Sequence, residues 1–214
     1  MIKVEKFVFS PFSENTYVIW DDETKETIIV DPGCFDESEE NNLSEFISKN
    51  ELKIAYLINT HCHIDHIFGC AFIKENYNPV FLAPEKDLPL LQNAVKQAEM
   101  FGVEIKTPPQ PDQYLSEDLV LSLNQSEIKF IFTPGHTPGE FCLYLKNEKI
   151  LISGDVLFKE GIGRTDLWGG NYDTLINSVN TKLLLLPSDV KVYPGHGEET
   201  TIGYEKVHNP FLKL

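Results

Sequence analysis

The sequence predicts an α/β protein, a four-layer sandwich in which two β-sheets lie between two layers of helices (αββα). Short apolar, partly β-branched runs recur along the chain and alternate with amphipathic stretches that have the length and spacing of helices. Such strands need helices over their outer faces, which gives the layered arrangement. Several strand-like runs also end in histidine or aspartate, so we expect a functional site at one edge of the sheets.

The first half of the chain is predicted to contain five strands and three helices. The expected strands are residues 7–9, 16–20, 27–30, 54–59 and 79–83. The expected helices are residues 36–49, 70–77 and 84–101. The last of these has Pro84 at its start and Gly102 at its end, which are the usual positions of these residues in a helix.

The second half repeats this order loosely, with strands followed by a helix and a further strand. Its expected strands are residues 119–123, 128–132, 141–145, 150–152 and 191–193, and its expected helices are residues 172–186 and a segment from about residue 198. Three prolines stiffen Thr107–Asp112, and we place the boundary between the halves near residues 107–113. We expect residues 1–214 to form one domain.

Composition excludes several classes of function. Hydrophobic residues make up 42% of the chain and charged residues 24%, as in ordinary globular proteins. The net charge of −15 argues against binding to nucleic acid or to an anionic membrane, because both need cationic side chains. The N-terminus lacks the apolar core of a signal peptide, and no apolar run of about eighteen residues occurs, so we expect a cytoplasmic protein. The four cysteines form no C-x-x-C pair and predict no disulfide framework.

A cluster of histidines follows the strand-like run at residues 54–59. His61, His63, Asp65 and His66 place three imidazoles and a carboxylate within six residues, and these are ligands that zinc and similar metals prefer. A single histidine is more often a surface or core residue, but clustered imidazoles repel one another on protonation and favour a metal site. By strand alternation Cys62 faces the opposite side, where we expect it to pack in the core.

Three further residues extend this candidate site. His136 and His196 each follow a strand-like run and a Pro-Gly turn, and Asp155 ends the strand at residues 150–152. Asp31 also ends a strand, either as a ligand or as a buttress for the histidine loop. His208 is expected at the surface.

The motifs His-x-His-x-Asp-His, Pro-Gly-His-Thr, Gly-Asp and Pro-Gly-His, in this order, resemble those of the metallo-β-lactamase superfamily. Within it the chain is similar to the glyoxalase II branch, the hydroxyacylglutathione hydrolases, and especially to its short bacterial members. The resemblance implies the αββα fold and a centre of two divalent metal ions, zinc first, with iron or manganese as alternatives. In the implied assignment, one metal is bound by His61, His63 and His136, the second by Asp65, His66 and His196, and Asp155 bridges the two.

The implied activity is thioester hydrolysis by a metal-bridging hydroxide that Asp65 and Asp155 orient, on a small-molecule substrate of the hydroxyacylglutathione type. A thiolate is a good leaving group that needs little general acid catalysis. Larger glyoxalase II enzymes carry a basic C-terminal region, whereas the tail here offers only Lys206 and Lys213, so the thiol carrier stays open. The oligomeric state, monomer or dimer, stays open too.

Arg164 is the only arginine in the chain and lies in a glycine-rich loop, residues 161–170. It is expected either to bind a substrate carboxylate or to form a pair that fixes the loop. The Gly-Arg-Thr-Asp sequence of this loop also resembles that of persulfide dioxygenases, which use one iron, and such an enzyme is the alternative function. Gly195 favours the hydrolase, because the dioxygenases usually have alanine at this place.

Overall fold

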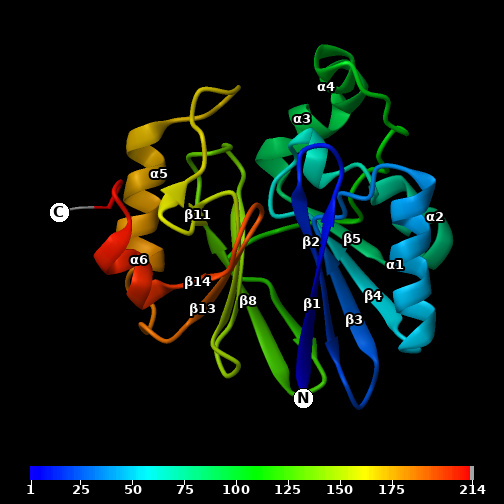
Figure 1. Cartoon of the computed structure of the whole chain (residues 1–214), viewed down its shortest axis with the longest axis horizontal. Helices are drawn as coiled ribbons and strands as arrows, with labels where there is room; N and C mark the ends of the chain where they lie inside the picture. The colour runs from blue at the N-terminus through cyan, green and yellow to red at the C-terminus, as the bar shows by residue number, and fades with distance from the viewer. Residues whose placement is uncertain (213–214) are drawn as a thin grey trace. The chain divides into compact units, whose positions relative to one another are not determined.

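A computed structural model describes residues 1–212, which form two compact units. The first unit holds Met1–Tyr114 and Leu123–Gln125, and the second holds Leu115–Ser122 and the chain from Ser126 onward. Each unit contains one six-stranded sheet with helices beside it (Figure 1). Lys213, noted above as a cation of the tail, lies outside the described residues.

The first sheet has its strands in sequence order, β1 to β6. These strands are β1 (Ile2–Phe9), β2 (Glu14–Asp21), β3 (Glu26–Val30), β4 (Lys53–Ile58), β5 (Val80–Ala83) and β6 (Gln113–Tyr114). The first two strands are longer than expected because they pair with each other over their full length. Neighbours from β3 to β6 are parallel, so β3, β4 and β5 all have their carboxyl ends at one edge of the sheet.

Two helices of the first unit agree with the sequence prediction. They are α1 (Glu37–Lys49) and α2 (Cys70–Tyr77), which lie beside the first sheet in Figure 1. Asp36 caps α1 by accepting a hydrogen bond from the backbone N–H of Glu39. Leu43 of α1 is fully buried in the core cluster of this unit.

The single helix expected at residues 84–101 is wrong. The structure has three short pieces there, η2 (Glu85–Asp87), α3 (Leu88–Gln92) and α4 (Ala94–Phe101). The helix breaks at Asn93, whose backbone has a φ of −102° and a ψ of 18°, and whose side-chain amide and backbone N–H both donate to the carbonyl of Pro89. Gly102 ends α4 with a φ of 69°, as its position predicted.

The second sheet has the strand order β14-β13-β10-β9-β8-β7. Its strands are β7 (Val120–Leu123), β8 (Ser126–Phe132), β9 (Phe141–Leu145), β10 (Ile150–Gly154), β13 (Lys191–Pro194) and β14 (Thr200–Thr201). Strands β10 and β13 are parallel, so both end at the same edge of the sheet. Two short strands, β11 (Leu157–Phe158) and β12 (Gly161–Ile162), form a separate hairpin in the segment expected to be a loop.

The helices of the second unit differ from the prediction at their ends. Helix α5 (Tyr172–Ser178) changes into a π-helical turn, η3 (Val179–Leu183), within the expected range. The last helix, α6 (Ile202–His208), begins later than residue 198. The reason is that Thr200 and Thr201 pair with β13, and Thr201 then caps α6 through its hydroxyl.

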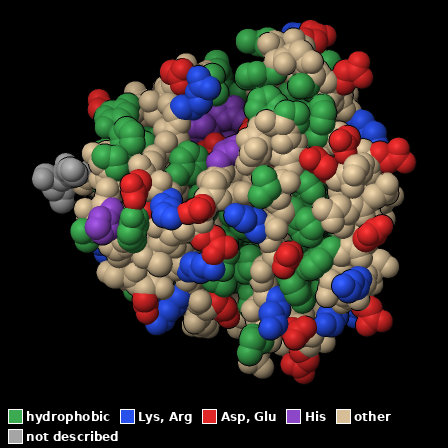
Figure 2. Space-filling model, viewed as in Figure 1, with side chains coloured by type: hydrophobic (Ala, Val, Ile, Leu, Met, Phe, Trp, Pro, Cys, Tyr) green, Lys and Arg blue, Asp and Glu red, His purple; other side chains and the backbone are tan. Residues whose placement is uncertain are grey.

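The mixed α/β class predicted from the sequence is confirmed by these two sheets and their helices. No helix within residues 1–212 is long and apolar enough to cross a membrane. On the face drawn in Figure 2, lysine side chains lie among aspartates and glutamates rather than in a patch of their own.

Candidate metal centre

The histidine cluster of the first unit stands at the carboxyl end of β4. Because β3, β4 and β5 are parallel, the segments that follow them lie at one edge of the sheet, where open α/β sheets commonly bind ligands. Asp31 follows β3 and Thr60 follows β4. The chain then turns through η1 (Ile64–His66), which brings His66 back toward His61.

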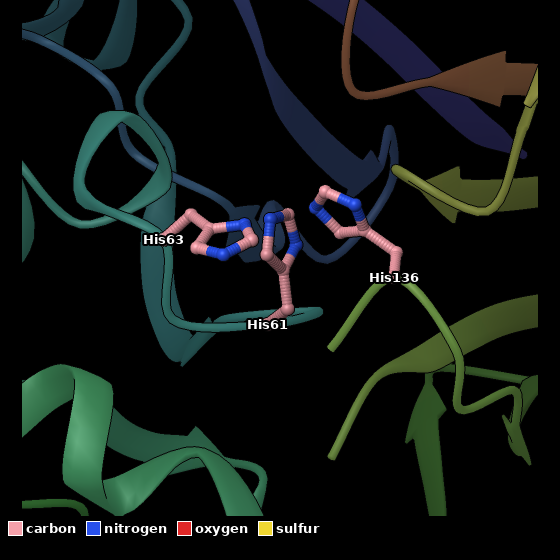
Figure 3. Close-up of side chains that lie close together, drawn as sticks. All are labelled: His61, His63 and His136. Carbon is pink, nitrogen blue, oxygen red and sulfur yellow. The ribbon is translucent and has the colours of Figure 1, made fainter. Parts of the chain in front are cut away.

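The three histidines of this loop are buried and close together. The ring centroids of His61 and His63 lie 5.0 Å apart, and those of His61 and His66 lie 4.1 Å apart. In Figure 3 the side chains of His61 and His63 project from the loop that follows β4, with their rings close together. Asp65 reaches the same cluster, with its Oδ2 atom 3.9 Å from Nε2 of His66. The first unit thus gathers three imidazoles and one carboxylate.

Asp31 supports this cluster from behind. One carboxylate oxygen, Oδ2, lies 3.2 Å from Nδ1 of His66 and accepts a hydrogen bond of 2.7 Å from the Thr60 hydroxyl. The other, Oδ1, accepts one of 2.7 Å from the Thr60 backbone N–H. Both oxygens therefore accept hydrogen bonds from Thr60 of the histidine loop. Of the two roles expected for Asp31, this favours support of the loop over direct binding of a metal. Its φ of 49° is one that aspartate tolerates better than most residues.

Glu14, the first residue of β2, is a second buried carboxyl beside His66. Its Oε2 atom lies 2.9 Å from the Thr16 hydroxyl, and its Oε1 atom lies 3.9 Å from Nδ1 of His66. Burial raises the pKa of the Glu14 carboxyl well above its ordinary value, with His66 opposing the rise and Asp31 adding to it.

Cys62 does not belong to the donor set. Its side chain is fully buried in the hydrophobic core cluster of the first unit, as strand alternation predicted. Burial raises the pKa of its thiol well above the ordinary value.

In the second unit, the donors come from the ends of three different strands. His136 lies in the turn after β8, Asp155 directly follows β10, and His196 follows β13. Oδ2 of Asp155 lies 3.5 Å from Nε2 of His136 and 3.6 Å from Nε2 of His196. His136, also labelled in Figure 3, and Asp155 are buried, whereas His196 is partly exposed.

Backbone contacts fix the donors of the second unit. Nδ1 of His136 lies 2.7 Å from the carbonyl oxygen of Arg164, a contact that leaves Nε2 directed toward Asp155. The backbone N–H of Asp155 donates to Oε1 of the buried Glu140 at 2.8 Å. Gly163 allows this close approach, since a Cβ atom there would lie 1.9 Å from the Asp155 carbonyl oxygen and 3.0 Å from Nδ1 of His136.

Arg164 forms a two-point ion pair with Asp166. Nε and Nη2 of the guanidinium lie 2.7 and 2.8 Å from the two carboxylate oxygens. This hydrogen-bonded pair lowers the pKa of Asp166 to about 2. The geometry matches the loop-fixing alternative, and binding of a substrate carboxylate by Arg164 would require the guanidinium to leave Asp166.

The donor sets of both units have the chemistry that divalent metals require. Ligands bound at about 2.0–2.2 Å in tetrahedral geometry lie about 3.3 Å apart, close to the separations measured around Asp155. In the first unit, Oδ2 of Asp65 lies 3.9 Å from Nε2 of His66, beside the ring of His61. Imidazole and carboxylate donors in this spacing fit zinc, iron and manganese.

Sequence reasoning missed the buried carboxyls behind these donors. Glu14 begins a strand that is buried at every position, and an acidic residue in such a strand was the available signal. Glu140 lies four residues after His136, just before the buried strand β9, and could have been found in the same way.

Comparison with known proteins identifies the family. The sequence profile of the metallo-β-lactamase superfamily matches residues 10–196. The chain belongs to this superfamily. The predicted metallo-β-lactamase fold is thereby confirmed.

Two relatives in this superfamily match almost the whole chain. GloC of Haemophilus influenzae, named a hydroxyacylglutathione hydrolase, is 37% identical over 213 residues, which is 99% of this chain and 98% of that protein. YqgX of Bacillus subtilis, a probable metallo-hydrolase, is 35% identical over the same shares of the two chains. Superfamily membership and these relatives support metal-dependent hydrolysis of a small molecule as the class of reaction.

Solved structures extend the comparison. The B3 metallo-β-lactamase BLEG-1 is 34% identical, with a TM-score of 0.90 and full coverage of both chains. TTHA1623, solved in a di-iron-bound form, is 33% identical, with a TM-score of 0.87 over 97% of this chain and 100% of that one. ETHE1 of Myxococcus xanthus is 25% identical, with a TM-score of 0.78 over 97% of this chain and 83% of that one.

Proposed function

We propose that this protein is a binuclear metal-dependent hydrolase of thioesters, with a hydroxyacylglutathione-type compound as its substrate. The observation that carries the proposal is that imidazole and carboxylate donors gather after β4 in the first unit and around Asp155 in the second. The hydrolase name of GloC supports the substrate class.

In this proposal the two donor sets act as one centre. One metal would be held by His61, His63 and His136 and the second by Asp65, His66 and His196, and Asp155 would contribute its carboxylate to this centre. The carboxylates of Asp65 and Asp155 also orient the attacking water. Bound divalent metals supply a Lewis acid for the thioester carbonyl and lower the pKa of water toward neutrality.

The protein's own residues then have defined tasks. Oδ2 of Asp31 lies 3.2 Å from Nδ1 of His66, and the Arg164 carbonyl accepts a hydrogen bond from Nδ1 of His136, so the Nε2 atom of each ring is the one left to act as a ligand. The leaving group is a thiolate, and because the pKa of a reference thiol is about 8.5, it can leave at neutral pH without a proton donor. This makes a thioester a better substrate for the site than an amide.

The alternative function is a persulfide dioxygenase with a single iron. Two observations favour it as the alternative: the Gly-Arg-Thr-Asp sequence at residues 163–166, and the structural likeness to ETHE1. Gly195, where the resemblance leads us to expect alanine in the dioxygenases, weighs against it.

The test is elemental analysis of metal per chain, on protein purified without chelators, with activity measured on the same sample. We expect close to two ions of zinc, iron or manganese and hydrolysis of S-lactoylglutathione. A single iron, with oxygen uptake on glutathione persulfide and no thioester hydrolysis, would support the dioxygenase instead. A β-lactam in the same panel tests the activity named for BLEG-1.

A further inference from the structure

Glu14 is a fully buried carboxyl for which the thioester chemistry proposed above has no task. It lies at the start of β2 with no exposed surface. Its Oε2 atom has the Thr16 hydroxyl as a partner, but its Oε1 atom has no hydrogen-bond partner among residues 1–212. A buried carboxyl oxygen without a hydrogen bond carries a desolvation penalty. Glutamate at this position therefore does not stabilise the fold through that oxygen.

The surroundings hold Glu14 in one position. The Thr16 hydroxyl, 2.9 Å from Oε2, also accepts a hydrogen bond of 2.8 Å from the Gly33 backbone N–H. A Cβ atom at position 33 would lie 2.0 Å from Oε2 of Glu14 and 2.9 Å from the Asp65 carbonyl oxygen. Glycine at this position therefore makes room for the carboxyl, immediately beside the backbone of the ligand loop.

The orphaned oxygen faces the candidate ligand His66. Oε1 of Glu14 lies 3.9 Å from Nδ1 of His66, on the same ring nitrogen that Asp31 approaches to 3.2 Å. All three side chains are buried. Two carboxyls thus stand behind one imidazole, whereas His136 has a backbone carbonyl oxygen at its Nδ1 atom.

We propose that Glu14 is a positioning residue that acts with Asp31 to hold His66 with Nε2 toward the metal and to strengthen metal binding at the Asp65–His66–His196 subsite. A negative or strongly dipolar group behind an imidazole raises its strength as a ligand and fixes its orientation. The inference rests on the proposed function for the existence of this subsite. It assigns to Glu14 a role in metal affinity rather than in the hydrolytic step.

The test is Glu14→Gln, which keeps the shape and the hydrogen bond to Thr16 but replaces the ionisable carboxyl with a neutral amide. The metal-free variant is titrated with Zn²⁺ or Co²⁺ against a competing chelator, and its thermal midpoint is measured without metal. We expect one of the two ions to bind about 10–100-fold more weakly, as for other outer-shell partners of metal ligands, with the other ion little affected. Glu14→Asp keeps a carboxyl group and should retain more affinity than Glu14→Gln.

The matched control is Glu205→Gln in the second unit. Glu205 is also fully buried, but it accepts from Thr200 and Asn209 and from the backbone N–H of Glu160, not from a candidate ligand. This variant should lose stability and bind both ions normally. If Glu14→Gln does not fold without metal, Glu14→Asp carries the same titration, with a smaller loss expected at one ion.

Two results would overturn the inference: unchanged affinity for both ions in the Glu14 variants, or an equal loss in Glu205→Gln. Failure of the proposed function looks different. If the unmodified protein binds two ions but hydrolyses no thioester, the substrate is wrong while the role of Glu14 stands. If it binds only one ion, the binuclear centre itself fails.

Discussion

The two units build their donor sets in different ways. In the first unit, all four donors lie within six consecutive residues, His61–His66, on one loop after one strand. In the second unit, His136, Asp155 and His196 follow three separate strands, β8, β10 and β13. A compact motif can thus be recognised from sequence alone, whereas dispersed donors come together only when the sheet has formed.

The support behind the donors differs as well. Side-chain carboxyls, Asp31 and Glu14, stand behind His66 in the first unit. In the second unit, the group at Nδ1 of His136 is the backbone carbonyl of Arg164. The carboxylate of Asp155 lies beside both histidines and is itself a candidate donor. The groups beside the candidate ligand His66 are thus side chains, which mutation can remove, whereas the group at Nδ1 of His136 belongs to the backbone.

The largest effect is expected at Asp155, the one carboxylate that lies beside both candidate histidines of the second unit. Asp155→Ala removes the carboxylate that lies beside both histidines of this unit. Because the variant loses a proposed metal ligand, thioester turnover should fall by more than the roughly 100-fold upper end that removal of a residue hydrogen-bonded to a ligand causes. Metal content and kcat/KM are measured together. Intact thioester turnover would refute the assigned roles.

Asp31→Asn should produce the next effect, in the first unit. Asparagine tolerates the φ of 49° at this position but removes the charge behind His66. Metal affinity should fall by about 10–100-fold, measured by chelator competition. The control is Asp36→Asn, which alters a helix cap of the same unit and should leave metal affinity unchanged. Equal losses of metal affinity in both variants would contradict the role of Asp31 as a support for His66.

Gly163→Ala tests the dependence of the second unit on its backbone. The added Cβ atom would lie 1.9 Å from the Asp155 carbonyl oxygen, so the loop must move. We expect unfolding free energy to fall by about 1–3 kcal/mol in denaturant titrations of the metal-free protein. Gly161→Ala, whose Cβ atom would meet nothing closer than 3.5 Å, is the control in the same loop and should be milder. Similar losses for both would show that the close approach does not matter.

Arg164→Gln should have the smallest effect on stability, because its ion pair with Asp166 is exposed. The pair holds the pKa of Asp166 down to about 2, so its stabilising effect is present above the ordinary aspartate pKa and lost as pH falls through about 2. In the variant this pKa should rise toward its ordinary value, which carbon-13 NMR of the carboxyl can follow.

The exposed Asp189, paired with Lys149, is the internal reference for that titration, because its lowered pKa should not change. The same variant separates the two roles expected for Arg164. A raised KM with an unchanged kcat would favour binding of a substrate carboxylate, and unchanged kinetics would favour the loop-fixing pair alone.

The sequence determined the features that depend on local chemistry. Strands with apolar runs, the helix at 70–77 and the strand at 141–145 could be placed from periodicity, because side chains repeat with the period of the element. The candidate donors could be named because several imidazoles and carboxylates lie at strand ends, and these are the groups that bind zinc and similar metals. Their assembly into one binuclear centre stays a prediction.

Only the tertiary structure decided what depends on residues distant in sequence. The pairing of Thr200–Thr201 with β13 displaced the start of the last helix. The approach of Glu14 to His66 joins residues that no local pattern connects. Such contacts form when strands pair and cores close, and their energies depend on burial and distance, which a linear sequence does not contain.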